Sequence, residues 1–281
     1  MDLKQIFKPS NPIIGVVHLL PLPTSPRWGG SLKAVIDRAE QEATALAAGG
    51  VDGIIVENFF DAPFPKDQVD PAVVSAMTVV VQRIQHMVTL PIGLNVLRND
   101  AQSALAIASC VQAQFIRVNV WTGIMATDQG LIEGRAHELL RYRRELGSDV
   151  KIFADVLVKH ARPLGGANLT TAVQDTIERG LADAVILSGW ATGNPPTLED
   201  LEVASDAANG TPVLIGSGAD WENIPHLMKS ANGVIVSSSL KRQGKRENSI
   251  DPIRVSRFVE AARRVTVSPP EKSVSSIKLR S

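Results

Sequence analysis

The chain has 281 residues, of which 44% are hydrophobic, and its 29 Lys and Arg balance 29 Asp and Glu. Such a chain can bury a large core in one or two domains, and its zero net charge argues against a general nucleic-acid binder. The charge is uneven, because residues 241–281 hold eleven Lys and Arg against four Asp and Glu. This basic end is either a solvated surface or a feature that favours an anionic membrane or an acidic partner.

The sequence shows no predicted signal peptide or membrane-spanning segment, and it contains one cysteine. The first twelve residues lack the charged and apolar regions of a signal peptide, and no apolar run approaches the roughly 20 residues that span a bilayer. We therefore expect any membrane association to be peripheral. The single cysteine, Cys110, excludes an internal disulfide and fits a reducing compartment. It lies in a run with helical spacing, where we expect a buried, inert thiol.

Short apolar runs rich in Val and Ile alternate along the chain with segments of helical spacing. Near-continuous apolar strands are typical of a parallel sheet that is covered on both faces. Ser31 is the predicted N-cap of the first helix, and Asp70 with Pro71 begins the second. The expected strands are 12–19, 53–58, 91–97, 115–121, 151–157, 184–189, 212–218 and 233–240. The expected helices are 31–50, 70–87, 99–111, 133–146, 170–180, 197–208, 221–230 and 252–264.

Eight strands that alternate with eight helices predict a single (β/α)8 TIM barrel over residues 1–265. A short disordered C-terminal tail is expected over residues 266–281, which have little apolar content. A doubly wound open sheet is the structural rival, but the regular alternation and the lack of an early dinucleotide glycine fingerprint count against it. The strand-to-helix links are long and irregular, so we expect function at the C-terminal end of the barrel strands.

Polar residues interrupt the apolar strands at similar depths. Arg117 and Asn119 are two residues apart and point the same way, and the barrel interior is the expected direction. Asn95 and Asp155 lie at similar depths on the two neighbouring strands, and a buried Arg117 needs a partner such as Asp155. The cluster is either an internal salt bridge or a polar floor that binds substrate, and these two interpretations are compatible.

Candidate acid–base residues follow several strands. His18 ends the first strand and Glu57 the second, so this pair is a candidate for general acid–base catalysis, although loop backbone could equally satisfy both. Asp155 and His160, near the end of the fifth strand, are further candidates. Lys159 has only a weak claim as a Schiff-base lysine. Scattered histidines make a metal site the weakest option, and we predict no metal and no cofactor.

The seventh and eighth strands both end in small residues, in "GSGAD" and "SSSLK". Barrel enzymes frequently bind phosphate with the loops after these two strands. Glycine lets the backbone approach an anion, although ordinary turns use the same residues. The predicted phosphate-binding residues are Gly216, Ser217, Gly218, Ser237, Ser238 and Lys241.

Several long segments resemble the BtpA family: "GVVHLLPLPTSP", "VENFFDAPF", "FIRVNVWTGIMATDQGLIEG", "DVLVKHA" and "VLIGSGAD" with "GVIVSSSLKRQG". The resemblance runs from Pro12 to Val265. It implies a TIM barrel and, in cyanobacteria, an extrinsic protein on the cytoplasmic side of thylakoids that serves photosystem I biogenesis. The implied partners are photosystem I or its assembly machinery and the thylakoid surface, and a homo-oligomer stays open. Relatives in organisms without photosynthesis imply an older activity.

The chain departs from the family pattern at three positions. Phe60 stands where a smaller residue is expected, Leu157 where a polar residue is common, and Ser237 in place of a glycine. Phe60 and Leu157 are expected to narrow or disable an ancestral cavity, so whether the chain is an enzyme stays open. Two hypotheses follow: a photosystem I biogenesis factor, and a barrel enzyme or sensor that acts on a small phosphorylated metabolite.

Overall fold

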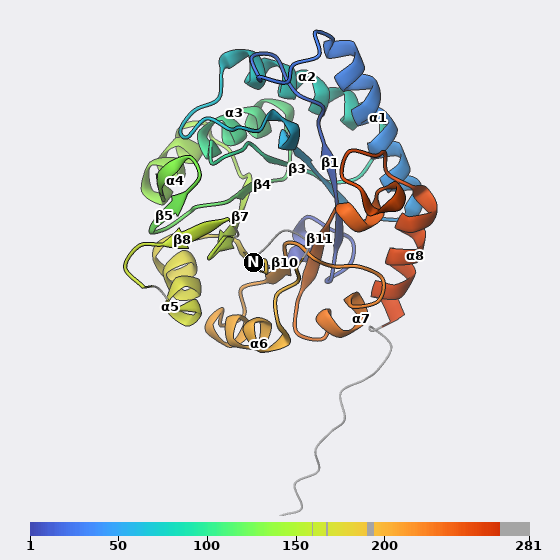
Figure 1. Ribbon diagram of the computed structural model, residues 1–281. Helices are drawn as coiled ribbons and strands as arrows, with labels where there is room; N and C mark the ends of the chain where they lie inside the picture. Colours follow the sequence, from blue (N-terminus) through green and yellow to red (C-terminus); the bar gives the residue numbers. More distant parts are fainter. Residues whose placement is uncertain (159, 167, 190–193, 265–281) are drawn as a thin grey trace, which may run out of the picture.

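Eight parallel strands close into a barrel, as Figure 1 shows in a view into the ring of strands. The structure is a computed structural model that describes residues 1–158, 160–166, 168–189 and 194–264. The closed order β1-β11-β10-β9-β7-β4-β3-β2 confirms the predicted (β/α)8 barrel. The predicted tail lies outside the described residues. The barrel strands are β1 (Ile13–His18), β2 (Gly53–Glu57), β3 (Ile92–Asn95), β4 (Phe115–Val118), β7 (Lys151–Val156), β9 (Ala184–Leu187), β10 (Val213–Ile215) and β11 (Gly233–Val236).

Helices cover the outside of the barrel (Figure 1). The predicted N-caps are confirmed, because Ser31 accepts a hydrogen bond from the amide of Ala34, and Asp70 accepts one from the amide of Ala72. The helices are α1 (Leu32–Gly49), α2 (Pro71–Met87), α3 (Ala101–Val111), α4 (Ala136–Glu145), α5 (Leu169–Gln174), α6 (Leu198–Ala207), α7 (Ile224–Leu227) and α8 (Pro252–Arg263). The predicted seventh helix is shorter than expected, since a turn capped by Asp220 occupies its first residues.

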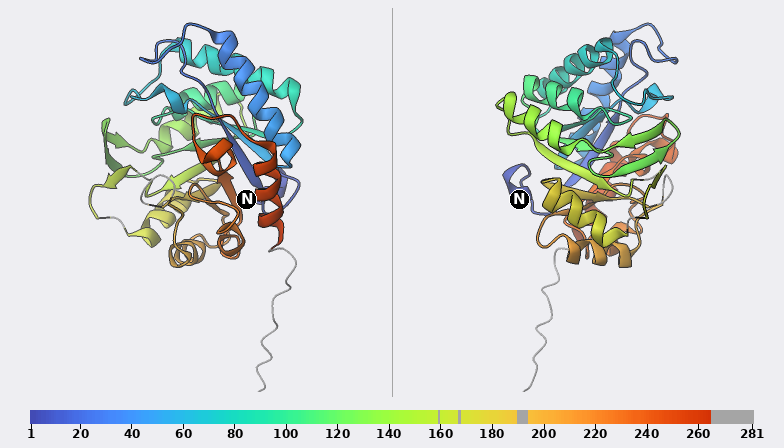
Figure 2. Two further views of the ribbon diagram at one scale, coloured as in Figure 1. Left: turned by 45° about the vertical axis from the view of Figure 1, so that its right-hand side comes forward. Right: turned by 90° about the vertical axis from the view of Figure 1, so that its left-hand side faces the viewer.

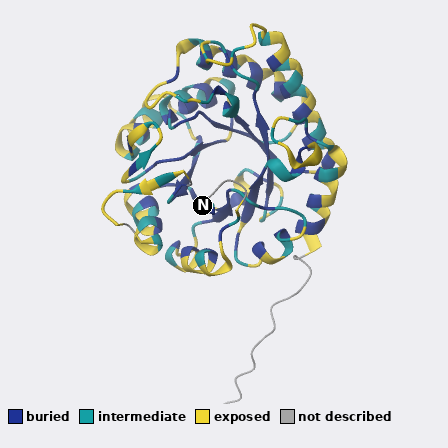
Figure 3. Ribbon diagram, in the orientation of Figure 1, coloured by how far each residue is buried: buried dark blue, intermediate teal, exposed yellow. Residues whose placement is uncertain are grey.

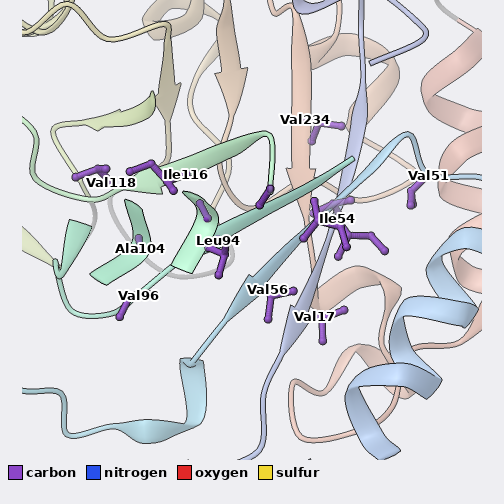
Figure 4. Packing of buried hydrophobic residues seen from close by; sticks show 14 of the residues in the cluster. Val17, Val51, Ile54, Val56, Leu94, Val96, Ala104, Ile116, Val118 and Val234 are labelled. Carbon is purple, nitrogen blue, oxygen red and sulfur yellow. The ribbon is translucent and has the colours of Figure 1, made fainter. Parts of the chain in front are cut away.

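Side chains alternate across the barrel wall. On β2, Ile54 and Val56 pack toward the helices, whereas Ile55 belongs to the cluster inside the barrel. Figure 4 shows Ile54 and Val56 with Val17 and Leu94 in the outer layer. Figure 3 shows the strands buried and the outer faces of the helices exposed. The core therefore consists of an outer layer between strands and helices and an inner layer within the barrel.

The N-terminal segment closes one end of the barrel. After a 3-10 turn, η1 (Leu3–Gln5), Phe7 inserts against Phe115 and Phe153, with ring centroids 5.6 and 6.5 Å away. Gly53 makes room for Phe7, since a Cβ at position 53 would come within 2.6 Å of its ring. This end of the barrel is a packed apolar plug.

A small antiparallel sheet lies at the other end, as the right-hand view of Figure 2 shows. Its strands are β5 (Ile124–Thr127), β6 (Gly130–Glu133) and β8 (Ala161–Pro163), in the order β6-β5-β8. These segments were expected to be irregular loops, so the sheet is an addition to the predicted fold. A separate apolar cluster supports it, made of Val120, Met125, Ile132 and Val158.

The prediction for Cys110 was wrong in one respect. The residue lies in α3 as expected, but its side chain is exposed. The buried face of α3 carries Ala104, Leu105 and Ala108, and Cys110 follows Ala108 by two residues, which places it on the opposite face.

Candidate functional site

A cavity of about 530 Å³ opens at the C-terminal end of the barrel strands. Its size is within the range that small-molecule sites occupy. Long strand-to-helix loops surround it, in agreement with the expected position of the site. The predicted residues that line it are His18, Glu57, Arg117, Asn119, His160, Gly216, Ser217, Gly218, Ser237 and Ser238.

Arg117, Asp155 and Asn119 form a buried cluster at the base of this cavity. Nε and Nη2 of Arg117 donate to the two carboxylate oxygens of Asp155, each over 2.8 Å, and Asn119 Nδ2 donates to Oδ2 over 3.0 Å. Burial alone would lower the pKa of the Arg117 guanidinium. The negative charge and the hydrogen bonds of Asp155 have the larger combined effect, so the pKa is raised. Asp155 is behind the cavity wall and has both oxygens engaged. This geometry suits a positioning residue better than the acid–base role predicted for it.

His18, Glu57 and Asn95 stand in register on β1, β2 and β3. His18 Nε2 lies 3.5 Å from Glu57 Oε2, and Asn95 Nδ2 donates to Glu57 Oε1 over 2.9 Å. Burial lowers the pKa of His18, and the hydrogen bond and charge of Glu57 oppose that effect. A neutral imidazole beside a carboxylate has the protonation state of a general base. Asn95 is not on the cavity wall, so it orients Glu57 instead of contacting a ligand.

Two phenylalanines hold the imidazole of His18. Phe59, in the 3-10 turn η2 (Phe59–Asp61), stacks on the ring at 4.3 Å, and Phe60 meets it edge-on at 6.0 Å. Phe59 lines the cavity, whereas Phe60 and Leu157 do not. The two departures from the family pattern therefore leave the cavity open, contrary to the expectation that they would narrow it.

The ends of β10 and β11 form the wall opposite Arg117 and Asn119, because β11 faces β4 across the closed strand order. Gly218 has φ +76°, and a Cβ there would overlap the backbone of Asn194 and Pro195. Among the described residues, the amides of Ser217 and Gly218 donate to no backbone acceptor. Backbone amides on a cavity wall are suitable donors to an anion.

Two serine hydroxyl groups in the loop after β11 contact the loop after β10 and the His18 side chain. Ser239, in the 3-10 turn η4 (Ser238–Leu240), donates to the carbonyl of Ala219 over 2.8 Å and so ties the loop after β11 to the loop after β10. Ser237 Oγ lies 3.4 Å from His18 Nε2. The predicted anion site and the predicted acid–base pair are therefore neighbours.

Lys241 differs from its predicted role. Its side chain is fully buried outside the cavity, where Nζ donates to both carboxylate oxygens of Glu42 over 2.7 and 2.6 Å. Arg38 also donates to Glu42, over 2.7 Å. A lysine held in this way by α1 secures the chain after β11 but does not reach a ligand at the cavity wall.

Loops bring further residues to the cavity that the strand pattern did not indicate. Arg98 follows β3 and is 8% exposed, and burial lowers the pKa of its guanidinium. Arg246 lies 5.8 Å from the Phe59 ring. Asp128 and Gln129 form the turn between β5 and β6. The "DQG" turn was the local signal for the hairpin, but each of its strands has only four residues.

His160 lies on the cavity wall with an exposed side chain and φ +58°, and the predicted Lys159 lies outside the described residues. Within the described ranges, no group of three or more His, Cys, Asp or Glu is placed to hold a metal ion. The groups that line the cavity include arginines, backbone amides, hydroxyls and the His18–Glu57 pair.

The fold and this cavity define a (β/α)8-barrel protein with a cavity lined by charged and polar side chains at the C-terminal end of its strands. The chain belongs to the BtpA family, whose sequence model matches residues 9–264. It is 76% identical over 273 residues to the "Photosystem I biogenesis protein BtpA" of Synechocystis, covering 97% of this chain and 95% of the relative.

Other relatives and structures are more distant. An uncharacterized protein of Thermococcus kodakarensis is 47% identical over 257 residues, or 92% of this chain and 97% of the relative. Phosphoribosylanthranilate isomerase from Pyrococcus furiosus superposes with a TM-score of 0.55 at 15% identity, covering 91% of this chain and all of the isomerase. That likeness supports the barrel fold alone.

Proposed function

We propose that this chain is a photosystem I biogenesis protein. The observation that carries the proposal is the 76% identity to the Synechocystis relative, which extends over almost the full length of both chains. The aligned length includes the barrel and its loops. We further propose that the chain acts at the thylakoid surface, on its cytoplasmic side, where it meets photosystem I or its assembly machinery.

A basic face supports attachment to such a surface. Residues 241–264, which include the 3-10 turn η5 (Arg242–Gly244) and α8, hold eight Lys and Arg against three Asp and Glu. Arg242, Lys245 and Arg257 are exposed there, and Ile253 is 79% exposed. Each basic residue near an anionic membrane contributes about 1 kcal/mol of attraction. Among the described residues no helix has the length and apolar character needed to cross a bilayer.

Complementation tests the biogenesis role. A Synechocystis strain that lacks its own relative, and whose photosystem I content has fallen, should regain photosystem I when this chain is expressed. Photosystem I is measured by its reversible light-induced absorbance change and is normalised to photosystem II. Full-length expression without any recovery would contradict the proposal.

Charge reversal tests the attachment. Arg242→Glu with Lys245→Glu should lower the membrane-bound fraction after cell breakage, and raised salt should lower it in the wild type. Arg135→Glu with Arg141→Glu on the outside of α4 changes the net charge equally and is the matched control. Equal membrane binding by both double variants would exclude the basic face from attachment.

We also propose that the cavity binds a small phosphorylated molecule. The protein would then act on this molecule as a barrel enzyme or respond to it as a sensor. The carrying observation is the wall formed by Gly216–Gly218 and Ser237–Ser239, where the amides of Ser217 and Gly218 donate to no backbone acceptor among the described residues. Arg98 and Arg246 line the same cavity and favour an anion. His18 and Glu57 beside Ser237 are the candidates for proton transfer.

Phosphate titration tests this site. Inorganic phosphate should raise the melting temperature of the wild type, and Ser238→Asp should abolish the shift because it places a carboxylate on the wall where the anion binds. Ser238→Ala is the matched control; it removes one hydroxyl donor without adding a charge, so it should reduce the shift without abolishing it. Gly218→Val should also lose it, since a side chain at position 218 displaces the loop. An unchanged shift in Ser238→Asp would contradict the site.

A further inference from the structure

Two buried polar side-chain atoms without hydrogen-bond partners belong to residues that line the cavity, among four such atoms in the described residues. The four atoms are Asn119 Oδ1, Gln129 Oε1, Ser188 Oγ and Trp221 Nε1. Asn119 and Gln129 line the cavity, and Ser188 lies against Gly216, which lines it too. Leaving such an atom unpaired costs about 1–3 kcal/mol, so the two atoms on the cavity wall indicate that a ligand supplies their partners.

Both amide groups on the wall donate to a carboxylate. Asn119 Nδ2 donates to Asp155, and Gln129 Nε2 donates to Asp128. A carboxylate accepts hydrogen bonds and cannot donate when ionised, so each amide must turn its NH2 group toward its acidic neighbour. Each amide oxygen is then left to accept from something else. Both amides therefore select a ligand that carries hydrogen-bond donors.

Arg117 narrows the choice of donor. It lines the cavity beside Asn119, and the guanidinium has five N–H groups, more than the two bonds that Asp155 accepts. Asn119 Oδ1 is a hydrogen-bond acceptor, and the neighbouring Arg117 guanidinium is a donor. A ligand hydroxyl group suits this pair because it can donate to Asn119 Oδ1 and accept from Arg117. An ammonium would be repelled by Arg117, and a carboxylate would bring no proton for the amide oxygens.

We propose that the ligand is a phosphorylated polyol or sugar that spans the cavity. Its phosphate binds at the ends of β10 and β11, and at least two of its hydroxyl groups donate to Asn119 and Gln129 on the side of β4 and the β5–β6 hairpin. β4 and β11 face one another in the closed strand order, so one ligand contacts both walls. This assignment rests on the proposed phosphate site and specifies what the rest of the ligand must carry.

A series of phosphate monoesters of similar size tests the assignment by calorimetric titration of the full chain. Glycerol 3-phosphate carries two hydroxyls, propyl phosphate carries none, and phosphoethanolamine carries an ammonium. Glycerol 3-phosphate should bind at least roughly tenfold more tightly than propyl phosphate, the effect of pairing one buried acceptor. Equal affinities, or a preference for phosphoethanolamine, would overturn the assignment.

Single-residue variants test whether the preference for a hydroxyl-bearing ester arises at Asn119 and Gln129. Asn119→Leu and Gln129→Leu should each reduce the ratio of the glycerol 3-phosphate affinity to the propyl phosphate affinity, whereas Gln41→Leu on the exposed side of α1 should leave that ratio unchanged. Gln129 lies in a surface turn, so its variant stays informative if Asn119→Leu fails to fold. Binding of inorganic phosphate with no hydroxyl preference overturns only the polyol assignment. No binding of inorganic phosphate or of any ester overturns the phosphate site and the polyol assignment together.

Discussion

The two ends of the barrel interior use the same strands for opposite purposes. On β4, Phe115 packs into the apolar plug, and Arg117, two residues later, lines the cavity. On β7, Phe153 and Asp155 repeat this division. The plug is stabilised by contact area, whereas the polar end is stabilised only because each buried charge has a partner. A single strand can therefore contribute one residue to the apolar core and, two positions later, one residue to the polar cluster. This requires that the buried charge on the strand has a partner on a neighbouring strand.

The largest effect should come from breaking the pair at the polar end. Asp155→Ala leaves Arg117, which is 6% exposed, without its carboxylate, and should lower the free energy of unfolding by about 3–5 kcal/mol. Urea denaturation measures this loss. Glu260→Ala, which breaks the exposed pair with Arg264, is the control and should cost less than about 1 kcal/mol. Equal losses of unfolding free energy in the two variants would show that the buried ion pair stabilises the fold no more than the exposed pair does.

A somewhat smaller effect is expected at the apolar end. Phe7→Ala removes a ring that is 1% exposed and should cost about 3 kcal/mol, near the lower limit for buried phenylalanines because the terminal segment can relax. The folded variant should still bind phosphate with wild-type affinity, since Phe7 lies at the opposite end from the cavity. Loss of binding in the folded variant would contradict the separation of the two ends.

The smallest expected effect depends on pH. The folded state lowers the pKa of His18 below its ordinary value of 6.5, so the unfolded chain binds a proton more readily. The stabilising contribution of neutral His18 is thus present above pH 6.5 and is lost as the pH falls from 6.5 toward the lowered pKa. The loss is at most about 1.4 kcal/mol per pH unit. His18→Gln should show a shallower fall in unfolding free energy between pH 7.5 and 5.5, and an identical fall would exclude this contribution.

The polar layer could be predicted because strand geometry and the cost of burying charge act together. The period-two alternation placed Arg117 and Asn119 on one face, and the need to neutralise a buried guanidinium indicated Asp155. The structure confirms this partnership with two hydrogen bonds. The strands were predicted from short apolar runs rich in Val and Ile, and the observed barrel strands lie within those runs.

The position of Lys241 could not be predicted, because its partner is 199 residues away in the sequence. A lysine after a barrel strand has the same local pattern whether it points into the cavity or toward α1, and only Glu42 decides between them. Arg98 was missed for a similar reason. Its loop is positioned by tertiary contacts, among them the bond from the amide of Leu97 to Asn58.

The most direct test of the account is a crystal structure of the full chain with inorganic phosphate at a concentration that saturates the thermal shift. We predict one phosphate on the wall between β10 and β11, within hydrogen-bond distance of the amides of Ser217 and Gly218 and of the Ser238 hydroxyl. A mouth without phosphate under these conditions, or phosphate bound only elsewhere on the molecule, would contradict the account.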